Sequence, residues 1–386
     1  MGCIVAKFGG SSLATAQMQK VAAIVRQNPE RRYIVPSAPG KAPEFQDKVT
    51  DLLYACQKAA VVQDTVAFEI VFSQIEARYQ SIVDGLGTHF DIHTPLQSVR
   101  HAIWEGADAD YAASRGEYLN GLILADLLHI PFIDPAGGIL FDANGNFDEN
   151  GTQLRFSALL ARHERGVIPG FYGVMPGGRI KTFSRGGSDI TGAIVARAVG
   201  ADLYENWTDV SGFLMTDPRI VPNPRTISKI SYRELRELSY MGASVLHEDS
   251  IFPVQKGGIP INVKNTNDPE HPGTMILAEP EDDHGCITGI AGKKGFTIIH
   301  LEKDKMNSEL GFGRRVLSVF EELGISFEHL PTGIDTLSVV ISDKQLNGHK
   351  EEVVRRLREV CSPDRIEVVS NLALIATVGH GMVRRV

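Results

Sequence analysis

Cysteine is scarce in this 386-residue sequence, and the four present stand far apart: Cys3, Cys56, Cys286 and Cys361. No two of them form a C-x-x-C pair, so the pattern favours neither a zinc site nor a disulfide framework. The twelve histidines show no metal-ligand spacing, and we expect the chain itself to hold no dedicated metal. Such cysteine usage is typical of a reducing compartment, and we expect the cytoplasm.

Long apolar runs are also missing from the sequence. No stretch reaches about 18 apolar residues, and the N-terminus lacks the apolar segment of a signal peptide. The opening letters MGCIVA resemble a lipidation signal superficially, but Ala6 stands where a serine or threonine is needed. We therefore interpret residues 3–8 as a buried strand and expect no membrane partner.

Positive charge is not in excess either. The net charge is −8, and no long run of lysine and arginine occurs, so we expect no nucleic-acid partner. An acidic protein can still bind a phosphate locally, because a few fixed donors outweigh the total charge.

The order of apolar runs divides the chain into two parts. Before about residue 280, short runs rich in valine and isoleucine alternate with helical stretches, and residues 49–128 are largely helical in pattern. This alternation predicts an α/β fold with a mostly parallel sheet. A segment rich in proline and acidic residues, 268–285, predicts a last strand followed by a linker. Residues 286–386 then predict a ferredoxin-like unit with strands at 286–292, 296–302, 326–331, 336–342, 365–370 and 373–379.

The stretch KFGGSS, residues 7–12, places a lysine and two glycines where the first predicted strand ends. Glycines allow a sharp turn and let backbone N–H groups approach a ligand, and a following helix start adds further donors. Lysine supplies a point charge for a phosphate. The same letters also fit a plain strand–helix turn with a serine N-cap, and spacing alone does not decide between the two.

A second glycine pair, in FSRGGSD at residues 183–189, precedes a clear helical pattern. Arg185 is suited to a substrate carboxylate because a guanidinium binds it with two parallel hydrogen bonds. Asp189 either caps the helix or orients a lysine or magnesium-bound phosphates. Two such helix starts in one α/β domain favour a nucleotide at one and its phosphate acceptor at the other.

Two further motifs are weaker when taken alone. In SRGE, residues 114–117, Glu117 either accepts from a substrate ammonium or lies on a solvated helix face. In WTDVSGFLMTDPR, residues 207–219, the aspartates either line a cleft or form turns.

Together these motifs resemble the aspartate kinases of the amino-acid kinase family, as do residues 35–40, 49–53 and 241–253. Residues 307–342 are similar to an ACT regulatory domain. The resemblance covers nearly the whole chain and implies a three-layer amino-acid kinase fold over residues 1–280 and an ACT region over 286–386. It implies transfer of the ATP γ-phosphoryl group to the β-carboxylate of L-aspartate, which starts the biosynthesis of lysine, threonine and methionine.

The resemblance also implies roles for individual residues. Lys7, with the N–H groups of Gly9 and Gly10, would hold the transferring phosphoryl, and Asp189 would hold Lys7. The aspartate pocket would be formed by Ser11, Ser12, Thr50, Glu117, Arg185 and Ser188. The nucleotide would contact Thr208, Asp209, Leu214 and Arg219, and Mg²⁺ would arrive with ATP.

One position departs from the family pattern. Many members carry a lysine where this sequence has Ser244, and we expect Lys264 or Arg219 to supply the missing charge. His247, in the same motif, is expected to be structural.

The regulatory part is expected to bind lysine, threonine or both, and to pair copies of the chain into a homodimer or larger oligomer. The implied effector contacts are Met306, Asn307, Ser308, Glu309 and residues 332–336, including Ile334 and Asp335. Capping and turn chemistry explains the same residues. Residues 286–292 and 372–386 resemble the opening strands of a second ACT unit that is incomplete at Val386. We expect a truncated chain or a covering partner, and impaired feedback inhibition or a changed oligomer relative to a chain with a complete second unit.

Two other functions remain open from the sequence. One is another enzyme of the same fold, acting on glutamate, acetylglutamate or UMP. The other is an amino-acid sensor with an inert kinase domain, which the serine at position 244 keeps in consideration.

Overall fold

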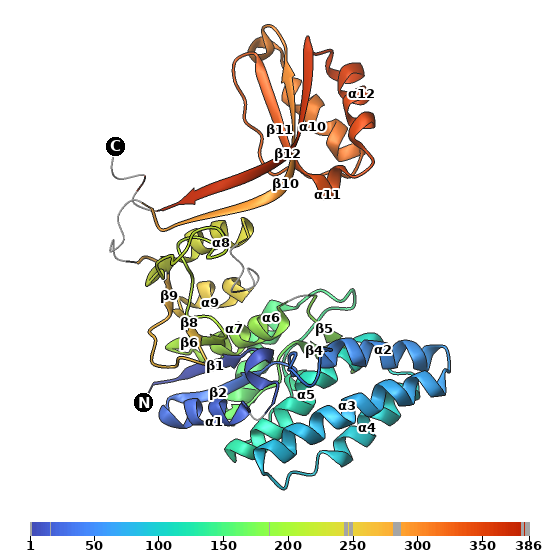
Figure 1. Cartoon of the computed structure of the whole chain (residues 1–386), viewed down its shortest axis with the longest axis vertical. Helices are drawn as coiled ribbons and strands as arrows, with labels where there is room; N and C mark the ends of the chain where they lie inside the picture. Colours follow the sequence, from blue (N-terminus) through green and yellow to red (C-terminus); the bar gives the residue numbers. More distant parts are fainter. Residues whose placement is uncertain are drawn as a thin grey trace. The chain divides into compact units, whose positions relative to one another are not determined.

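The computed structural model describes residues 2–15, 17–184, 186–242, 246, 250–280, 287–379 and 382. The chain divides into two compact units, residues 1–289 with 378–386 and residues 290–377. Figure 1 shows that each unit has its own sheet and helices. Within the described ranges, no helix is both long and apolar enough to cross a lipid bilayer.

The first unit is built on a sheet of seven strands among the described residues, in the order β3-β2-β1-β6-β8-β9-β7. Neighbouring strands pair in parallel, except β8 and β9, which are antiparallel. The mostly parallel sheet predicted from the sequence is therefore confirmed. Its strands are β1 (Ile4–Phe8), β2 (Arg31–Pro36), β3 (Gly166–Val167), β6 (Leu203–Thr208), β7 (Lys229–Ser231), β8 (Ile261–Asn265) and β9 (Thr274–Leu277).

Helices from the first third of the chain share one apolar core with one face of this sheet. Their side chains pack with Ala6, Phe8 and Trp207 of β1 and β6. The longer members form the blue to teal bundle of Figure 1, and they fill the region predicted as helical. These helices are α1 (Met18–Gln27), α2 (Val49–Val61), α3 (Thr65–Leu86), α4 (His93–Trp104) and α5 (Ala109–Leu128).

The helix α7 (Gly187–Val199) packs against β1, β2 and β6 and contacts α6 (Glu149–Leu160) and α9 (Ile251–Gly257). Side chains alternate between the two faces of a strand. Lys7 therefore points toward α7, while Ala6 and Phe8 on either side of it enter the core formed with α1–α5. The hairpin of β4 (Tyr172–Val174) and β5 (Ile180–Thr182) precedes α7, and α8 (Tyr232–Tyr240) follows β7 with a Ser231–Glu234 capping box.

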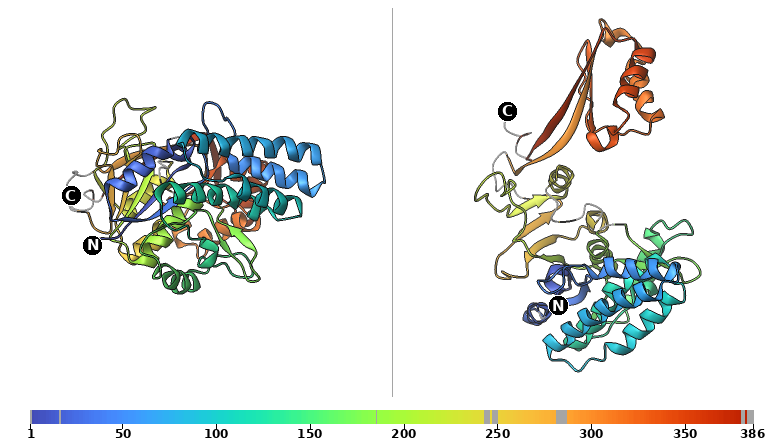
Figure 2. Two further views of the ribbon diagram at one scale, coloured as in Figure 1. Left: turned by 90° about the horizontal axis from the view of Figure 1, so that it is seen from below. Right: turned by 45° about the vertical axis from the view of Figure 1, so that its right-hand side comes forward.

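The second unit has a three-stranded sheet within the described residues, in the order β11-β10-β12. The strands are β10 (Gly289–Glu302), β11 (Thr336–Ser342) and β12 (Arg365–Val378). The helices α10 (Phe312–Glu322) and α12 (Lys350–Cys361) contact each other and share an apolar core with the sheet, and a short α11 (Asp343–Leu346) follows β11. Figure 2 shows β10 and β12 running side by side as a long ribbon.

This sheet differs from the sequence prediction in two ways. Two successive strands were predicted within residues 286–302, but the described part of this segment contains one continuous strand, β10. Two more were predicted within 365–379, and they form one continuous strand, β12. Gly295 and Asn371 interrupt the apolar pattern, but both have positive φ, so each strand bends there without ending. The strand predicted at 326–331 is wrong as a regular strand, since it pairs with β11 through an isolated bridge between His329 and Val340.

Candidate functional site

The two glycine-rich motifs of the sequence meet in the first unit through a buried ion pair. The Nζ atom of Lys7 lies 2.6 Å from Oδ1 of Asp189, and the two side chains are 9% and 15% exposed. Lys7 is the fourth residue of β1 and Asp189 lies in the first turn of α7. The Asn206 side-chain amide, on the adjacent strand β6, donates to the same Oδ1 atom at 2.9 Å. A cation is thus fixed at the positive end of a helix, where an anion would also be stabilised.

The loop after Lys7 is packed backbone to backbone. Residues Gly10–Leu13 form a 3₁₀ turn, and the Gly40 N–H donates to the Gly10 carbonyl at 2.9 Å. A Cβ atom on Gly10 would lie 2.6 Å from the Ala38 carbonyl oxygen, so no larger residue fits without a backbone shift. The Gly9 N–H donates to the Trp207 carbonyl at 3.0 Å, so it is not free for the phosphate contact predicted for it. The contacts of Lys7 and the Gly10 N–H with a phosphate stay predictions.

The second glycine loop enters α7 through Gly186, whose φ of +59° is in the left-handed region that favours glycine. A Cβ atom on Gly187 would lie 2.4 Å from the Phe171 ring, so this helix start also requires a glycine. Ser188 follows on the buried side, where it abuts Gly170. Arg185, predicted to bind a substrate carboxylate, lies outside the described residues, as do Ser244 and His247.

Glu117 is a buried carboxyl group in the interior of α5, with 6% of the residue exposed. Its Oε2 atom is buried and has no hydrogen-bond partner in the structure. Burial raises the pKa of Glu117 to about 8, although hydrogen bonds from the Ala38 N–H and the Ser188 hydroxyl and the nearby Arg115 charge oppose this rise. A buried oxygen without a donor is costly, and a ligand ammonium would satisfy it.

Three hydroxyl groups predicted to line the acceptor pocket are placed differently. Ser12 is buried and donates to the Thr266 hydroxyl at 2.8 Å. Ser11 is exposed, and Thr50 is half-buried in the first turn of α2. The Ser12 hydroxyl is therefore bonded to Thr266, just after β8, whereas the Ser11 and Thr50 side chains remain accessible to a ligand.

The residues predicted to bind the nucleotide follow the end of β6. Thr208 ends that strand and donates to Asp209 at 3.1 Å, and Leu214 forms an isolated bridge with Thr226. Arg219 is exposed and forks onto Asp217, an ion pair that lowers the pKa of Asp217 to about 2. These residues thus lie on loop segments at the carboxyl end of a parallel strand, where α/β sheets commonly bind ligands.

Lys264 is on the other face of the sheet from Lys7. Its Nζ lies 5.1 Å from the centre of the Trp207 ring, which stacks on Phe8 in the core formed with α1–α5. This placement does not bring Lys264 to the Lys7–Asp189 pair, and its assignment to the phosphates stays a prediction.

The predicted effector residues lie in the second unit, and their two segments meet. The Asn307 N–H donates to the Ile334 carbonyl at 3.1 Å, and the Lys305 N–H donates to the Asp335 carboxylate at 2.9 Å. Met306 packs in the core, while Ile334 is 69% exposed. Ser308 donates to the Lys305 carbonyl, and Glu309 pairs with Lys303 and Arg315.

Several residues around the Lys7–Asp189 pair were not predicted from the sequence. Asn206 and Thr266 contact Asp189 and Ser12, respectively. In the sequence, each is only a polar residue within or just after a predicted strand. Such a residue does not distinguish a functional site from an ordinary loop. Asn120 anchors the Ser37 carbonyl from α5 at 2.8 Å, and its Oδ1 atom is buried without a partner.

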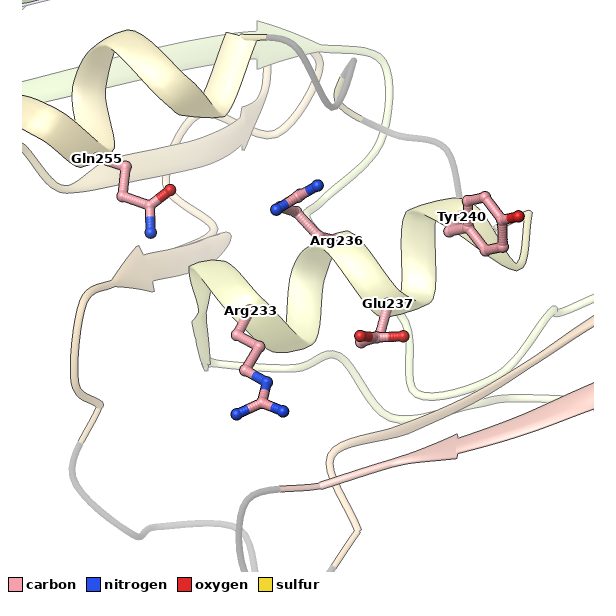
Figure 3. Close-up of a pocket in the computed structure, with 5 residues that line it drawn as sticks. All are labelled: Arg233, Arg236, Glu237, Tyr240 and Gln255. Atoms are coloured by element: carbon pink, nitrogen blue, oxygen red, sulfur yellow. The ribbon is translucent and has the colours of Figure 1, made fainter. Parts of the chain in front are cut away.

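A separate hollow of about 530 Å³ lies between α8 and α9. Figure 3 shows Arg233 and Arg236 of α8 and Gln255 of α9 around it. Among the residues that the structure describes, none that was predicted from the sequence lines this hollow, and its arginines are exposed, unlike Lys7.

Comparisons with known proteins agree with this geometry. Residues 2–265 match the model of the amino acid kinase family. Aspartokinase 3 of Bacillus subtilis is 38% identical over 98% of this chain and 86% of its own length. The crystal structure of Clostridium acetobutylicum aspartate kinase, described as an allosteric enzyme, is 53% identical, covers 99% of this chain and 88% of that one, and has a TM-score of 0.90.

Aspartokinase III of Escherichia coli is a more distant neighbour, solved in two states. Its complex with aspartate and ADP is 25% identical, covers 99% of this chain and 88% of that one, and has a TM-score of 0.75. Its complex with lysine and aspartate is 25% identical over 98% and 87% of the two chains, with a TM-score of 0.74.

Proposed function

Because this chain belongs to the amino acid kinase family and, within it, to the aspartokinases, we propose that it phosphorylates L-aspartate as follows. An oxygen of the aspartate β-carboxylate attacks the γ-phosphorus of ATP, and the bond from that phosphorus to the β–γ bridging oxygen breaks. The products are 4-phospho-L-aspartate and ADP. This reaction starts the biosynthesis of lysine, threonine and methionine.

The observation that carries this proposal is the buried Lys7–Asp189 ion pair at the start of α7. Phosphoryl transfer needs mainly positioning and neutralisation of charge on the transferring group. Lys7 supplies that charge beside the closely packed backbone at Gly10. Asp189 holds the ammonium in place, and Asn206 fixes the carboxylate of Asp189.

The acceptor amino acid binds next to this pair. Glu117 receives the α-ammonium on its unpartnered Oε2 atom, and this contact supports an assignment to an amino-acid substrate. Arg185 takes a carboxylate of the substrate. The pocket is completed by the hydroxyls of Ser11, Ser12, Thr50 and Ser188.

The nucleotide lies at the carboxyl end of β6. Thr208, Asp209 and Leu214 contact the adenosine part, and Arg219 or Lys264 supplies charge to the phosphates. Mg²⁺ is carried in by ATP and neutralises phosphate charge when bound, since this ion keeps several waters and needs few protein ligands. The exposed carboxylate of Asp209 is an oxygen donor of the type that Mg²⁺ accepts.

Regulation is assigned to the C-terminal part of the chain. Residues 1–280 form the catalytic domain and residues 286–386 the ACT region, through which copies of the chain associate. Lysine, threonine or both bind where residues 306–309 and 332–336 meet. The lysine complex of the Escherichia coli relative supports a lysine effector.

The proposal is tested by incubating the purified chain with ATP, Mg²⁺ and L-aspartate and trapping the acyl phosphate as its hydroxamate. We expect hydroxamate that depends on both substrates. Release of ADP with glutamate, acetylglutamate or UMP in place of aspartate would indicate another enzyme of this fold. Lysine binding without any phosphoryl transfer would indicate an inert sensor.

A further inference from the structure

Arg78, in the interior of α3, is the most deeply buried charged side chain among the described residues, with 1% of the residue exposed. Its Nη2 atom donates to the Gly40 carbonyl at 2.6 Å. Its Nε and Nη1 atoms are buried and have no hydrogen-bond partner. The guanidinium also lies over the Phe45 ring, 4.5 Å from its centre.

Stability does not explain this arginine. Within the described residues, no carboxylate lies within 4.0 Å of Arg78 to form an ion pair. Burial lowers the pKa of Arg78, and the more distant charge of Glu44 opposes this shift. A buried cation without a paired anion costs free energy, whereas an apolar side chain of similar volume would fill the space at little or no cost. We therefore attribute the presence of an arginine at position 78 to the groups that its guanidinium contacts.

It holds the segment 37–45, which we call the acceptor loop. The side of this loop that faces the proposed site makes three contacts. The Ser37 N–H donates to the Phe8 carbonyl at 3.1 Å, the Gly40 N–H donates to the Gly10 carbonyl at 2.9 Å, and the Ala38 N–H hydrogen-bonds to Glu117.

The other side of the loop meets the helices. Asn120 of α5 holds the Ser37 carbonyl, and Arg78 of α3 holds the Gly40 carbonyl and the Phe45 ring. Ala42 and Phe45 close the tip by exchanging two backbone hydrogen bonds, of 2.9 and 3.0 Å. Arg78 is thus the charged anchor of a loop whose opposite side contacts Gly10 and Glu117.

We propose that Arg78 is a positioning residue for the acceptor amino acid: by holding Gly40 and Phe45, it places the acceptor loop against Gly10 and Glu117. This proposal rests on the proposed function, since it assigns Glu117 to the substrate ammonium. Loss of the anchor moves the Ala38 N–H away from Glu117 and loosens the wall of the pocket. Aspartate binding weakens, while the nucleotide end and the Lys7–Asp189 pair are unaffected.

The first test is the kinetics of Arg78→Met, a variant that keeps the volume and removes the donors. We expect the KM for aspartate to rise about tenfold, because small displacements of positioning groups have effects of this size or larger. The kcat and the KM for ATP stay within about twofold, and Tm does not fall by more than about 2 °C, because the lost charge was poorly satisfied. Arg78→Lys, which can still donate to the Gly40 carbonyl, recovers most of the aspartate KM.

The matched control is Arg100→Met, which removes an arginine of the same helical bundle that pairs with Glu69 on its surface. It should leave both KM values unchanged. An unchanged aspartate KM in Arg78→Met, or a fall in Tm with equal losses for both substrates, would show a merely structural role and overturn the proposal.

A second measurement does not depend on catalysis. Hydrogen exchange followed by mass spectrometry should show faster exchange of residues 37–45 in Arg78→Met than in the unmodified chain, and no change in Arg100→Met. Unchanged exchange would refute the anchoring role. If the unmodified chain fails to phosphorylate aspartate, the proposed function fails, and exchange alone decides whether Arg78 anchors the loop.

Discussion

The two units of the molecule treat charge in opposite ways. The first unit buries ionisable side chains on α3, α5 and β6 and at the end of β1, among them Lys7, Arg78, Arg115, Glu117 and Glu205. In the described part of residues 290–377, Thr297 is the one polar side chain that is buried, and the core is apolar. Most of the ion pairs of this second unit lie on its surface, as Arg355 does with Glu352 and Glu359.

Buried charges in the first unit differ in whether their polar atoms have partners. Glu205 is buried but fully satisfied, since Arg31 forks onto it and the Trp207 indole N–H donates to it at 2.8 Å. Such a network stabilises the sheet. Glu117 and Arg78 keep buried atoms without partners, which costs free energy, and we assign a bound ligand to Glu117 and a positioning role to Arg78.

The largest loss of activity is expected from Lys7→Met. The change removes the cation that neutralises the transferring phosphoryl, and we expect kcat to fall about a thousandfold. The hydroxamate assay measures the loss. The matched change in the second unit is Lys350→Met, which loses one surface contact to Ser370 and should leave kcat unaltered. Equal activity of the two variants would contradict the assignment of Lys7.

Glu117 gives a second, pH-dependent prediction. With a pKa of about 8 in the free protein, its carboxylate form increases as the pH rises toward 8. The KM for aspartate should therefore rise about tenfold for each pH unit below 8, because only the carboxylate attracts an ammonium. Initial rates from pH 6 to 9 measure this. Glu117→Gln should raise the KM about a hundredfold and abolish the pH dependence.

The same group links stability to pH. Its pKa is higher in the folded chain than its ordinary value of 4.5, so the folded chain binds the proton more tightly. The stabilisation is present below pH 4.5 and is lost as the pH rises through about 8. Relative to Glu117→Gln, the unmodified chain should therefore lose Tm over this interval and regain it when aspartate is added. A constant Tm difference would show that Glu117 is not held in its protonated form.

A smaller effect is expected from Asn206→Leu. Lys7 and Asp189 can still pair, but the carboxylate of Asp189 loses the amide that orients it. We expect kcat to fall about tenfold with little change in either KM, since a hydrogen bond to a charged carboxylate contributes about 1.5 kcal/mol or more. Asn146→Ala, in an exposed turn, serves as the control. A kcat equal to that of the control would remove Asn206 from the site.

The smallest effect belongs to the second unit. Arg355→Ala breaks two surface ion pairs, and exposed pairs contribute little because water screens them. We expect Tm to shift by no more than about 2 °C, with the rate of aspartate phosphorylation unchanged. A larger fall in Tm would show that surface charge in this unit is not the weak contributor that the comparison requires.

The sequence predicts the fold of the first unit because periodicity reports which face of each element is buried. Alternating apolar runs and helical stretches indicated the parallel sheet, and glycine pairs marked two turns next to it. In the second unit the same reasoning divided β10 and β12 into two strands each. A glycine or asparagine can either end a strand or bend it, and Gly295 and Asn371 bend theirs.

The candidate site is less readable from the sequence. Lys7, Asp189 and Glu117 lie in short motifs that mark them locally. If both glycine-rich helix starts are assigned to the same sheet, the contact between Lys7 and Asp189 can be predicted as well. Asn206, Thr266 and Arg78 carry no such mark. Their roles depend on contacts between segments distant in the chain, such as Arg78 with Gly40, and periodicity carries no information about such contacts.

The central claim is tested most directly by a crystal structure of this chain with L-aspartate and a non-hydrolysable ATP analogue. We expect the aspartate ammonium to donate to Oε2 of Glu117, and Nζ of Lys7, still paired with Asp189, to contact the γ-phosphate. Aspartate bound away from Glu117, or a γ-phosphate out of reach of Lys7, would contradict it.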